Sequence, residues 1–125
     1  MIKNFLIISC IGQDDKLGLM INKDFFIKNF KKNNNNNLVT EIIRFIKSHK
    51  VKLDENFSVL VNQGPGSFSG IRISLAIAKG MEISKKVKIY GYCKDDLKVF
   101  NKENVEKLLI DNLIEKNLIK PIYLS

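Results

Sequence analysis

The most constraining feature of this sequence is a short apolar run that leads directly into a glycine-rich turn and then into a long helix-like segment. The run is Phe57–Val61, the turn spans residues 64–70, and the helical pattern extends to about Ser84. A strand, a glycine turn and a helix in this order direct backbone N–H groups and the positive end of the helix toward the turn. Phosphate binding is therefore one hypothesis for this segment.

The glycine spacing does not match the known nucleotide-binding signatures. Gly64, Gly66 and Gly70 miss the G-x-G-x-x-G spacing by one residue, and no Gly-Lys-Ser/Thr closes the turn. We favour a structural interpretation, in which the glycines beside Pro65 supply the positive φ values of a tight turn and a serine caps the helix. The serines available as caps are Ser67 and Ser69.

The helix that follows the turn is apolar on all sides, whereas a surface helix normally has one apolar stripe. Its large apolar residues are Ile71, Ile73, Leu75, Ile77, Met81 and Ile83. Small residues also recur every four positions, which would let a second helix approach closely. They form two series, Gly70, Ser74, Ala78 and Ala76, Gly80, Ser84. We predict that one side of this helix meets a partner protein; a helix sandwiched inside the fold is the alternative.

The remaining pattern predicts an α/β fold with a mixed sheet. The expected strands are 3–11, 17–21, 25–30, 57–61 and 87–91, and the expected helices are 38–49, 68–84, 95–100 and 103–116. Residues 13–16 are expected to form a turn, Asn33–Asn37 to form a flexible polar loop that offers side-chain oxygens to cap the first helix, and 121–124 to be extended. Three antiparallel strands come first, and βαβα units follow.

Length and charge limit the function classes. The 125 residues suffice for one core, and 45% hydrophobic content argues against disorder. The net charge of +8 favours an anionic partner, but it comes from nineteen Lys and only two Arg, Arg44 and Arg72. Because phosphate and base readers use Arg and aromatic stacking, we interpret the charge as a lysine-rich surface and keep direct nucleic-acid binding as the alternative.

The sequence offers little for catalysis or metal binding. His49 is the single histidine and is expected to be a solvated surface group, while Ser67 and Cys93 lack an evident general base. The pairs Asp14-Asp15 and Asp95-Asp96 are expected to cap and solvate turns. No catalytic residue, metal or cofactor is therefore predicted. Cys10 and Cys93 are expected to be thiols, and the absence of a leader-like or membrane-spanning pattern predicts a cytoplasmic protein.

Residues 64–80 closely resemble the signature G-P-G-S-F-T-G-x-R-x-G-x-x-x-A-K-G of the TsaB family of tRNA threonylcarbamoyladenosine biosynthesis proteins. The residues that carry the resemblance are Gly64, Pro65, Gly66, Ser67, Phe68, Ser69, Gly70, Arg72, Ser74, Ala78 and Gly80, with Ser69 and Ser74 standing where the family usually has Thr and Gly. The similarity is good over 57–93 and weak over most of the rest, including a tail at 120–125 that is similar to the family's P-x-Y-L-R.

The resemblance implies a ribonuclease H-like domain of the actin-like ATPase superfamily. It implies a non-catalytic subunit that forms a heterodimer with the transferase TsaD, is joined by the ATPase TsaE, and supports threonylcarbamoylation of adenosine 37 in tRNAs that read ANN codons. The helices at 38–49 and 68–84 would face TsaD, with contact from Leu38, Ile42, Phe45, the motif residues, Ile77 and Met81. In isolation the same helices could pair with a second copy, and contact with tRNA would be indirect.

Several departures from the family affect this expectation. Ser9 stands where the first strand of the family has Asp, and the histidine usual before the first helix falls within Asn33–Asn37. Residues 1–125 are expected to form a single domain of the family's N-terminal type, with 92–125 a reduced remnant of the second domain. A small nucleotide- or phosphate-binding hydrolase that uses the Gly64–Gly70 loop is the alternative function.

Overall fold

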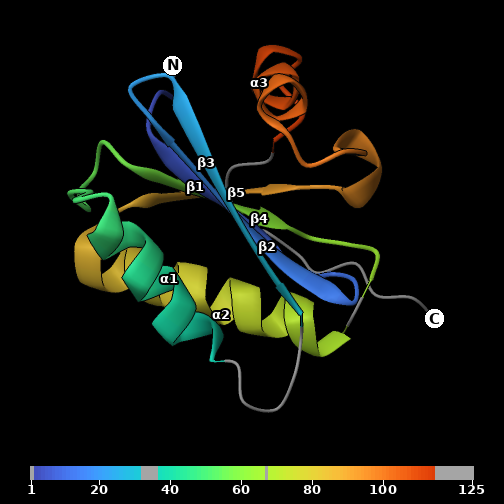
Figure 1. Ribbon diagram of the computed structural model, residues 1–125, viewed down its shortest axis with the longest axis horizontal. Helices are drawn as coiled ribbons and strands as arrows, with labels where there is room; N and C mark the ends of the chain where they lie inside the picture. The colour runs from blue at the N-terminus through green and yellow to red at the C-terminus, as the bar shows by residue number, and fades with distance from the viewer. Residues whose placement is uncertain (1, 32–36, 67, 115–125) are drawn as a thin grey trace.

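A five-stranded mixed sheet forms the centre of the protein (Figure 1). The computed structural model describes residues 2–31, 37–66 and 68–114 of the chain. The strands are β1 (Phe5–Ser9), β2 (Asp14–Ile21), β3 (Asp24–Lys31), β4 (Ser58–Asn62) and β5 (Lys88–Tyr92), in the spatial order β3-β2-β1-β4-β5. The predicted mixed sheet is confirmed, with three antiparallel strands first and crossover units after them.

The first three strands form a meander whose second hairpin is longer than the sequence predicts. β2 pairs with β3 from Asp14 opposite Lys31 to Ile21 opposite Asp24, and Asn22 and Lys23 turn the chain with positive φ angles. The prediction of a turn at residues 13–16 is therefore wrong for 14–16. The alternation of apolar residues begins only at Leu17, but pairing with β3 extends the strand backward.

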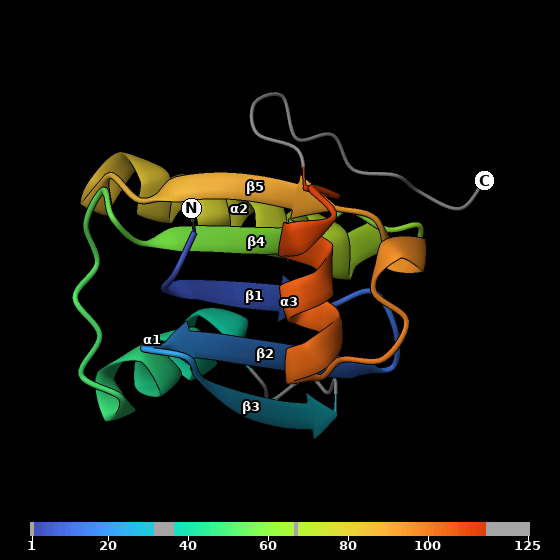
Figure 2. The ribbon, with the colours of Figure 1, turned by 90° about the horizontal axis from the view of Figure 1, so that it is seen from above.

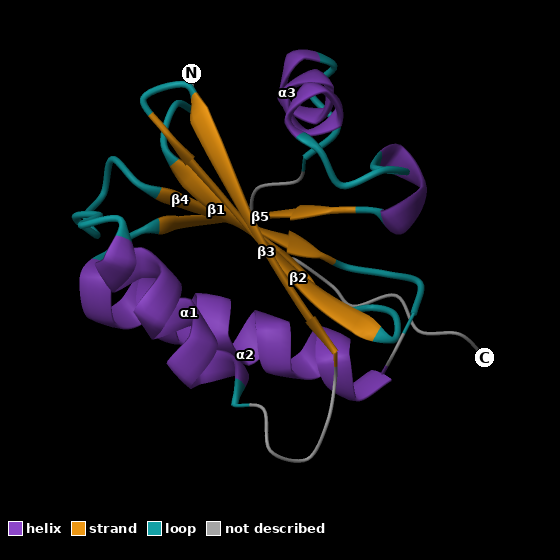
Figure 3. Cartoon of the chain, in the orientation of Figure 1, coloured by secondary structure: helices purple, strands orange, loops and turns teal. Residues whose placement is uncertain are grey.

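Two long helices cover one face of the sheet (Figure 3). Helix α1 (Leu38–Ser48) and helix α2 (Phe68–Lys85) match the predicted helices within one residue at each end. Asn37 caps α1, because its side-chain oxygen accepts a hydrogen bond from the Thr40 N–H at 3.2 Å. Asn33–Asn36, also expected to help with capping, lie outside the described residues.

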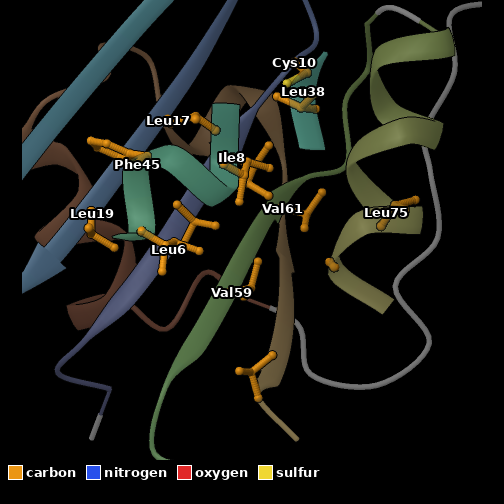
Figure 4. Packing of buried hydrophobic residues seen from close by; sticks show 14 of the residues in the cluster. Leu6, Ile8, Cys10, Leu17, Leu19, Leu38, Phe45, Val59, Val61 and Leu75 are labelled. Atoms are coloured by element: carbon orange, nitrogen blue, oxygen red, sulfur yellow. The ribbon is translucent and has the colours of Figure 1, made fainter. Parts of the chain in front are cut away.

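The core between these helices and the sheet comes from every second strand residue. Leu6 and Ile8 on β1, Leu17 and Leu19 on β2, and Val59 and Val61 on β4 point into it (Figure 4). The helices add Leu38, Ile42, Phe45 and Ile46 from α1, and Ile71, Leu75 and Ala78 from α2. This is the larger of the two buried clusters.

The opposite face is covered by one short helix (Figure 2). After β5 the chain makes a single 3₁₀ turn, η1 (Lys94–Asp96), and then helix α3 (Lys102–Ile110). Val105 and Leu108 of α3 are buried with Phe5, Ile7, Leu60 and Tyr92 of the sheet. The predicted helix at 95–100 is thus only the turn at 94–96, and the predicted helix at 103–116 ends at Ile110. Residues 115–125, with the expected extended segment, lie outside the described residues.

Among the described residues, no helix combines the length and the apolar character that crossing a bilayer requires.

Candidate functional site

The glycine turn is held at the carboxyl ends of β4 and β5. Gly64 has a φ of 101°, its N–H donates to Asn62 Oδ1 at 2.9 Å, and its carbonyl accepts from the Lys94 N–H at 2.8 Å. Gly66 is required for a different reason, since a Cβ there would lie 2.6 Å from both Cβ and O of Ile11. The structural interpretation is thus confirmed for Gly64, while close packing against the β1–β2 connection, and not a positive φ, explains Gly66.

Neither of the two serines predicted to cap α2 is seen to cap it. Ser69 lies inside α2, one residue after its start, so it is not the residue that precedes the helix. Ser67 lies outside the described residues. Pro65 follows Gly64 through a cis peptide bond and is half-buried.

A small polar cluster lies where β1, β4 and β5 end. Asn62 Nδ2 donates to Ser9 Oγ at 3.3 Å, and the Tyr92 hydroxyl donates to the Ile8 carbonyl at 3.2 Å. Burial raises the pKa of Tyr92 well above its ordinary value of 10.0, and hydrogen bonds with Ser9 and Asn62 only partly oppose this. Tyr92 is therefore a neutral hydrogen-bond donor at physiological pH, and Asn62 joins the end of β1 to the glycine turn.

This cluster borders a cavity of about 500 Å³. Its charged lining residues are Asp14, Lys16, Lys94, Asp95 and Lys98, and Ser9, Gln13 and Asn62 contribute polar groups. Three ammonium groups and two carboxylates give this cavity mixed electrostatics with a small excess of positive charge. Gly64 and Gly66, at the start of the turn, are not among its lining residues, so this part of the turn supports the wall through Ile11 without forming it.

The fold treats the two carboxylate pairs differently. Asp14 lines the cavity while Asp15 is buried within β2, whereas Asp95 lines the cavity and also, together with Asp96, a second hollow beside α3. Within the described parts of the chain, no three His, Cys, Asp or Glu side chains lie close enough to hold a metal ion together. Cys10 is a buried thiol and Cys93 a half-buried one.

His49 is not the solvated surface group that the sequence predicts. It follows the last turn of α1, half-buried, with its ring centroid 4.2 Å from that of Phe26 and 5.2 Å from that of Phe45. Its Nδ1 lies 3.0 Å from the Phe45 carbonyl oxygen. The ring therefore packs between the edge strand β3 and the end of α1. The sequence around His49, with its neighbouring lysines, does not predict this packing because Phe26 is distant in the chain.

The structure divides the predicted partner-facing residues of α2 into two opposite stripes. Gly70, Ser74 and Ala78 are buried with Ile71 and Leu75 against the sheet, so this series of small residues serves the close approach of α2 to β4 and β5. The prediction that Gly70, Ser74 and Ala78 face a partner is wrong for this reason. Ile77 and Met81 are half-buried at the edge of the same core, and Arg72 and Ser69 are exposed. Of the side chains of Ser67 and Phe68 nothing is described.

The other stripe of α2 is exposed. Ile73 and Ile83 are 48% and 80% exposed, and Ala76 and Gly80 lie between them on the same side of the helix. A Cβ placed on Gly80 would meet nothing within 4 Å. Large apolar side chains therefore flank a smooth, open strip along the outer surface of α2.

On helix α1, too, the residues predicted to face a partner are not the exposed ones. Leu38, Ile42 and Phe45, predicted to face a partner, are buried in the core beneath the helix, and Val39 and Ile43 are exposed instead, each at 46%. Glu41 bonds to Lys28 of β3 at 2.9 Å and to Arg44 at 3.3 Å. The hydrogen bond from Lys28 is the main reason why the pKa of Glu41 lies below its ordinary value.

Sequence reasoning missed Asn62, Gln63 and Tyr92 as parts of this region. Gln63 is buried and packs on Gly91, where a Cβ would lie 2.5 Å from the Gln63 side chain. The available signal was that two amides directly follow an apolar strand and precede the glycine turn. Buried amides at a strand end need hydrogen-bond partners, and neighbouring strands supply them.

The arrangement of strands and helices is that of a known fold class. A solved structure of YeaZ from Pseudomonas aeruginosa superposes with a TM-score of 0.67 at 13% identity, over 88% of this chain and 50% of that one. A second structure, of a Pseudomonas aeruginosa protein described as uncharacterized with similarity to the peptidase YEAZ, gives 0.65 at 15% identity over 76% and 44%. These neighbours confirm the predicted α/β fold of ribonuclease H-like type.

Sequence comparison finds similarity to proteins of one named function. The chain is 34% identical over 64 residues to the tRNA threonylcarbamoyladenosine biosynthesis protein TsaB of Buchnera aphidicola subsp. Schizaphis graminum, covering 51% of this chain and 30% of that protein. It is 41% identical over 46 residues to the TsaB of Buchnera aphidicola subsp. Baizongia pistaciae, covering 37% and 21%. No family model matches the sequence.

The matches thus span less than a third of those relatives' length and about half of the solved neighbours. The chain is thus similar in sequence to two TsaB proteins over part of its length, and it shares the fold of the solved neighbours.

Proposed function

We propose that this chain is a non-catalytic TsaB-like subunit that binds a TsaD-like transferase and so supports threonylcarbamoylation of adenosine 37 in tRNA. The sequence similarity supports a place in this biosynthesis, because both relatives are named tRNA threonylcarbamoyladenosine biosynthesis proteins. A TsaE-like ATPase would join through the complex, and tRNA would be bound by the complex as a whole. Under this proposal residues 92–125 stand in for the second domain of the longer relatives.

The observation that carries the proposal is the exposed apolar stripe on the helix layer. Ile73 and Ile83 flank Ala76 and Gly80 on the outside of α2, while Val39 and Ile43 are exposed on α1 in the same layer (Figure 1). A strip without bulky side chains lets the backbone of a partner helix come close, and the flanking isoleucines then lose contact with water. The occupant would thus be an apolar helix of the transferase.

The non-catalytic part of the proposal rests on the residues at the end of β1. Ser9 stands where the resemblance expects a carboxylate, and its hydroxyl accepts a hydrogen bond from Asn62. A serine held in this way lacks the charge needed to position a cation beside phosphate. The cavity beside it would thus have lost the group that phosphate chemistry requires.

Co-expression with the TsaD-like transferase of the same organism tests the partner role. The wild-type chain should co-purify as a heterodimer, and Gly80→Arg and Ile73→Asp should each weaken it at least about tenfold. Both positions are exposed, so the isolated variants should keep their folded circular dichroism spectrum. Val99→Asp, an equally exposed apolar position outside the helix layer, is the matched control. Absence of a complex with the wild-type chain at micromolar concentration would contradict the proposal.

A second candidate function is binding of a phosphate-bearing ligand in the 500 Å³ cavity. The specific observation is that Lys16, Lys94 and Lys98 converge on it together with Ser9 and Asn62. Calorimetry with ATP, ADP and inorganic phosphate tests this function, and Lys94→Met should abolish any heat that is seen. No heat at millimolar ligand would remove nucleotide binding, and with it the hydrolase alternative.

A further inference from the structure

The second buried cluster leaves a large hollow on the α3 side of the sheet. A cavity of about 950 Å³ lies between the start of β1, the β2–β3 hairpin, β5 and α3. Its apolar lining comes from Ile2, Phe5, Met20, Tyr90, Leu109 and Ile110. A mainly apolar hollow of this size is more than a one-core domain normally leaves open to water. It lies near the amino end of β1, away from the polar cavity beside Ser9.

The end of α3 directs the chain toward this cavity. The Leu113 N–H donates to the Leu108 carbonyl at 3.0 Å, the Asn112 N–H donates to the Leu109 carbonyl at 3.1 Å, and Asn112 has a φ of 56°. These two bonds with a left-handed residue form a Schellman motif, which ends a helix and reverses the chain. The next residue, Ile114, packs against the buried cluster and lines the cavity wall.

The eleven residues that follow Ile114 have the composition of an occupant. They include two apolar runs, Leu118-Ile119 and Ile122-Tyr123-Leu124, with Lys120 and Pro121 between them. Fully extended, they reach at most about 35–40 Å, more than enough to cross the cavity from its rim. A covalently attached segment also has an effective concentration in the millimolar range, which a second copy of the chain reaches only in concentrated solution.

We propose that residues 115–125 dock into the 950 Å³ cavity and complete the core on the α3 side of the sheet. The apolar side chains of the segment would cover Met20, Tyr90 and Ile110, and the Schellman motif would fix where the segment enters. Ile110 is 73% exposed and would become buried under the docked segment.

Hydrogen exchange of the full-length chain tests this inference at residues 115–125. In the wild type these amides should exchange at least about tenfold more slowly than in the isolated peptide. Ile110→Asp places a charge in the rim and should remove most of this protection. Ile83→Asp makes the same change at a helix position that is 80% exposed and outside the cavity, and should leave the protection unchanged.

A second variant tests the same docking by a substitution within residues 115–125. Leu118→Asp should release residues 115–125 as Ile110→Asp does, whereas Asn117→Asp adds the same charge one residue earlier and should release less. Exchange of the wild-type segment at the peptide rate would overturn the proposal. So would protection that depends on protein concentration, which would indicate a second copy, or protection that persists in Ile110→Asp, which would place the segment elsewhere.

Discussion

The two faces of the sheet are covered to very different extents. One face carries α1 and α2, of eleven and eighteen residues, while the other carries α3, of nine residues. On the first face the apolar residues left exposed, such as Ile73 and Ile83, lie on the outside of a complete layer. On the second face Ile110 lies at the rim of a hollow. Under our two proposals, the exposed apolar side chains form a partner surface in the first case and the rim of an incomplete core in the second.

The largest effect is expected beneath the complete layer. Phe45→Ala removes a buried ring that packs on His49 and the α1-side core, and should lower the free energy of unfolding by about 3–5 kcal/mol. Ile43→Ala, on the exposed side of the same helix, should change it by less than about 0.5 kcal/mol. Urea unfolding measures both. Equal losses in the two variants would mean that α1 does not have an inner and an outer side as described.

A somewhat smaller loss is expected on the sparsely covered face. Leu108 is buried between α3 and the sheet, so Leu108→Ala should cost about 2–4 kcal/mol in the same urea measurement. Lys107→Ala on the exposed side is the control. A loss of less than about 0.5 kcal/mol in Leu108→Ala would mean that α3 does not pack on the sheet as part of the folded unit. The comparison between the two faces would then no longer hold.

Two glycines, one in the glycine turn and one on the outer side of α2, should give intermediate effects of opposite sign. Gly66→Ala places a Cβ against Ile11 and should destabilise the protein by about 1–3 kcal/mol. Gly80→Ala adds a Cβ in open space within a helix and should stabilise it by about 0.5–1 kcal/mol. Thermal unfolding of both variants should thus give shifts in opposite directions. A loss of stability in Gly80→Ala would show that the outer strip of α2 is already covered.

The smallest effect concerns the ion pair that joins β3 to α1. Because the pKa of Glu41 is lowered by Lys28, the pair stabilises the folded state above the ordinary value of 4.5, and this contribution is lost as pH falls below it. Glu41→Gln should therefore be slightly less stable than the wild type at neutral pH and should lose less stability on acidification. Its effect is small because the Lys28 side chain is 40% exposed. Parallel pH profiles for the two proteins would contradict the assigned role.

The sequence predicts the order and type of the elements because each has a clear local period. It does not show which stripe of α2 faces the sheet, since Ile71 and Leu75 on one side and Ile73 and Ile83 on the other read equally apolar. Burial of the first pair is decided by β4 and β5, which only the fold brings beneath them. The bond between Asn62 and Ser9 was missed for the same reason, because 53 positions separate the two residues.

The extent of β2 and α3 also depends on tertiary pairing. Asp14–Lys16 carry no strand pattern of their own, and β3 recruits them through its backbone. At α3 the apolar pattern continues past Ile110, but Asn112 adopts a left-handed conformation and ends the helix. The resemblance in the 64–80 motif correctly indicated the fold, while burial reassigned Leu38, Ile42, Phe45, Ser74 and Ala78 to the core.

The contrast between the faces is tested most directly by hydrogen exchange of the full-length chain with and without the TsaD-like transferase of the same organism. The account predicts added protection in α1 and α2, centred on residues 73–83, and no change in α3 or at the β2–β3 hairpin. Added protection confined to α3, or none anywhere when the transferase is present at micromolar concentration, would contradict it.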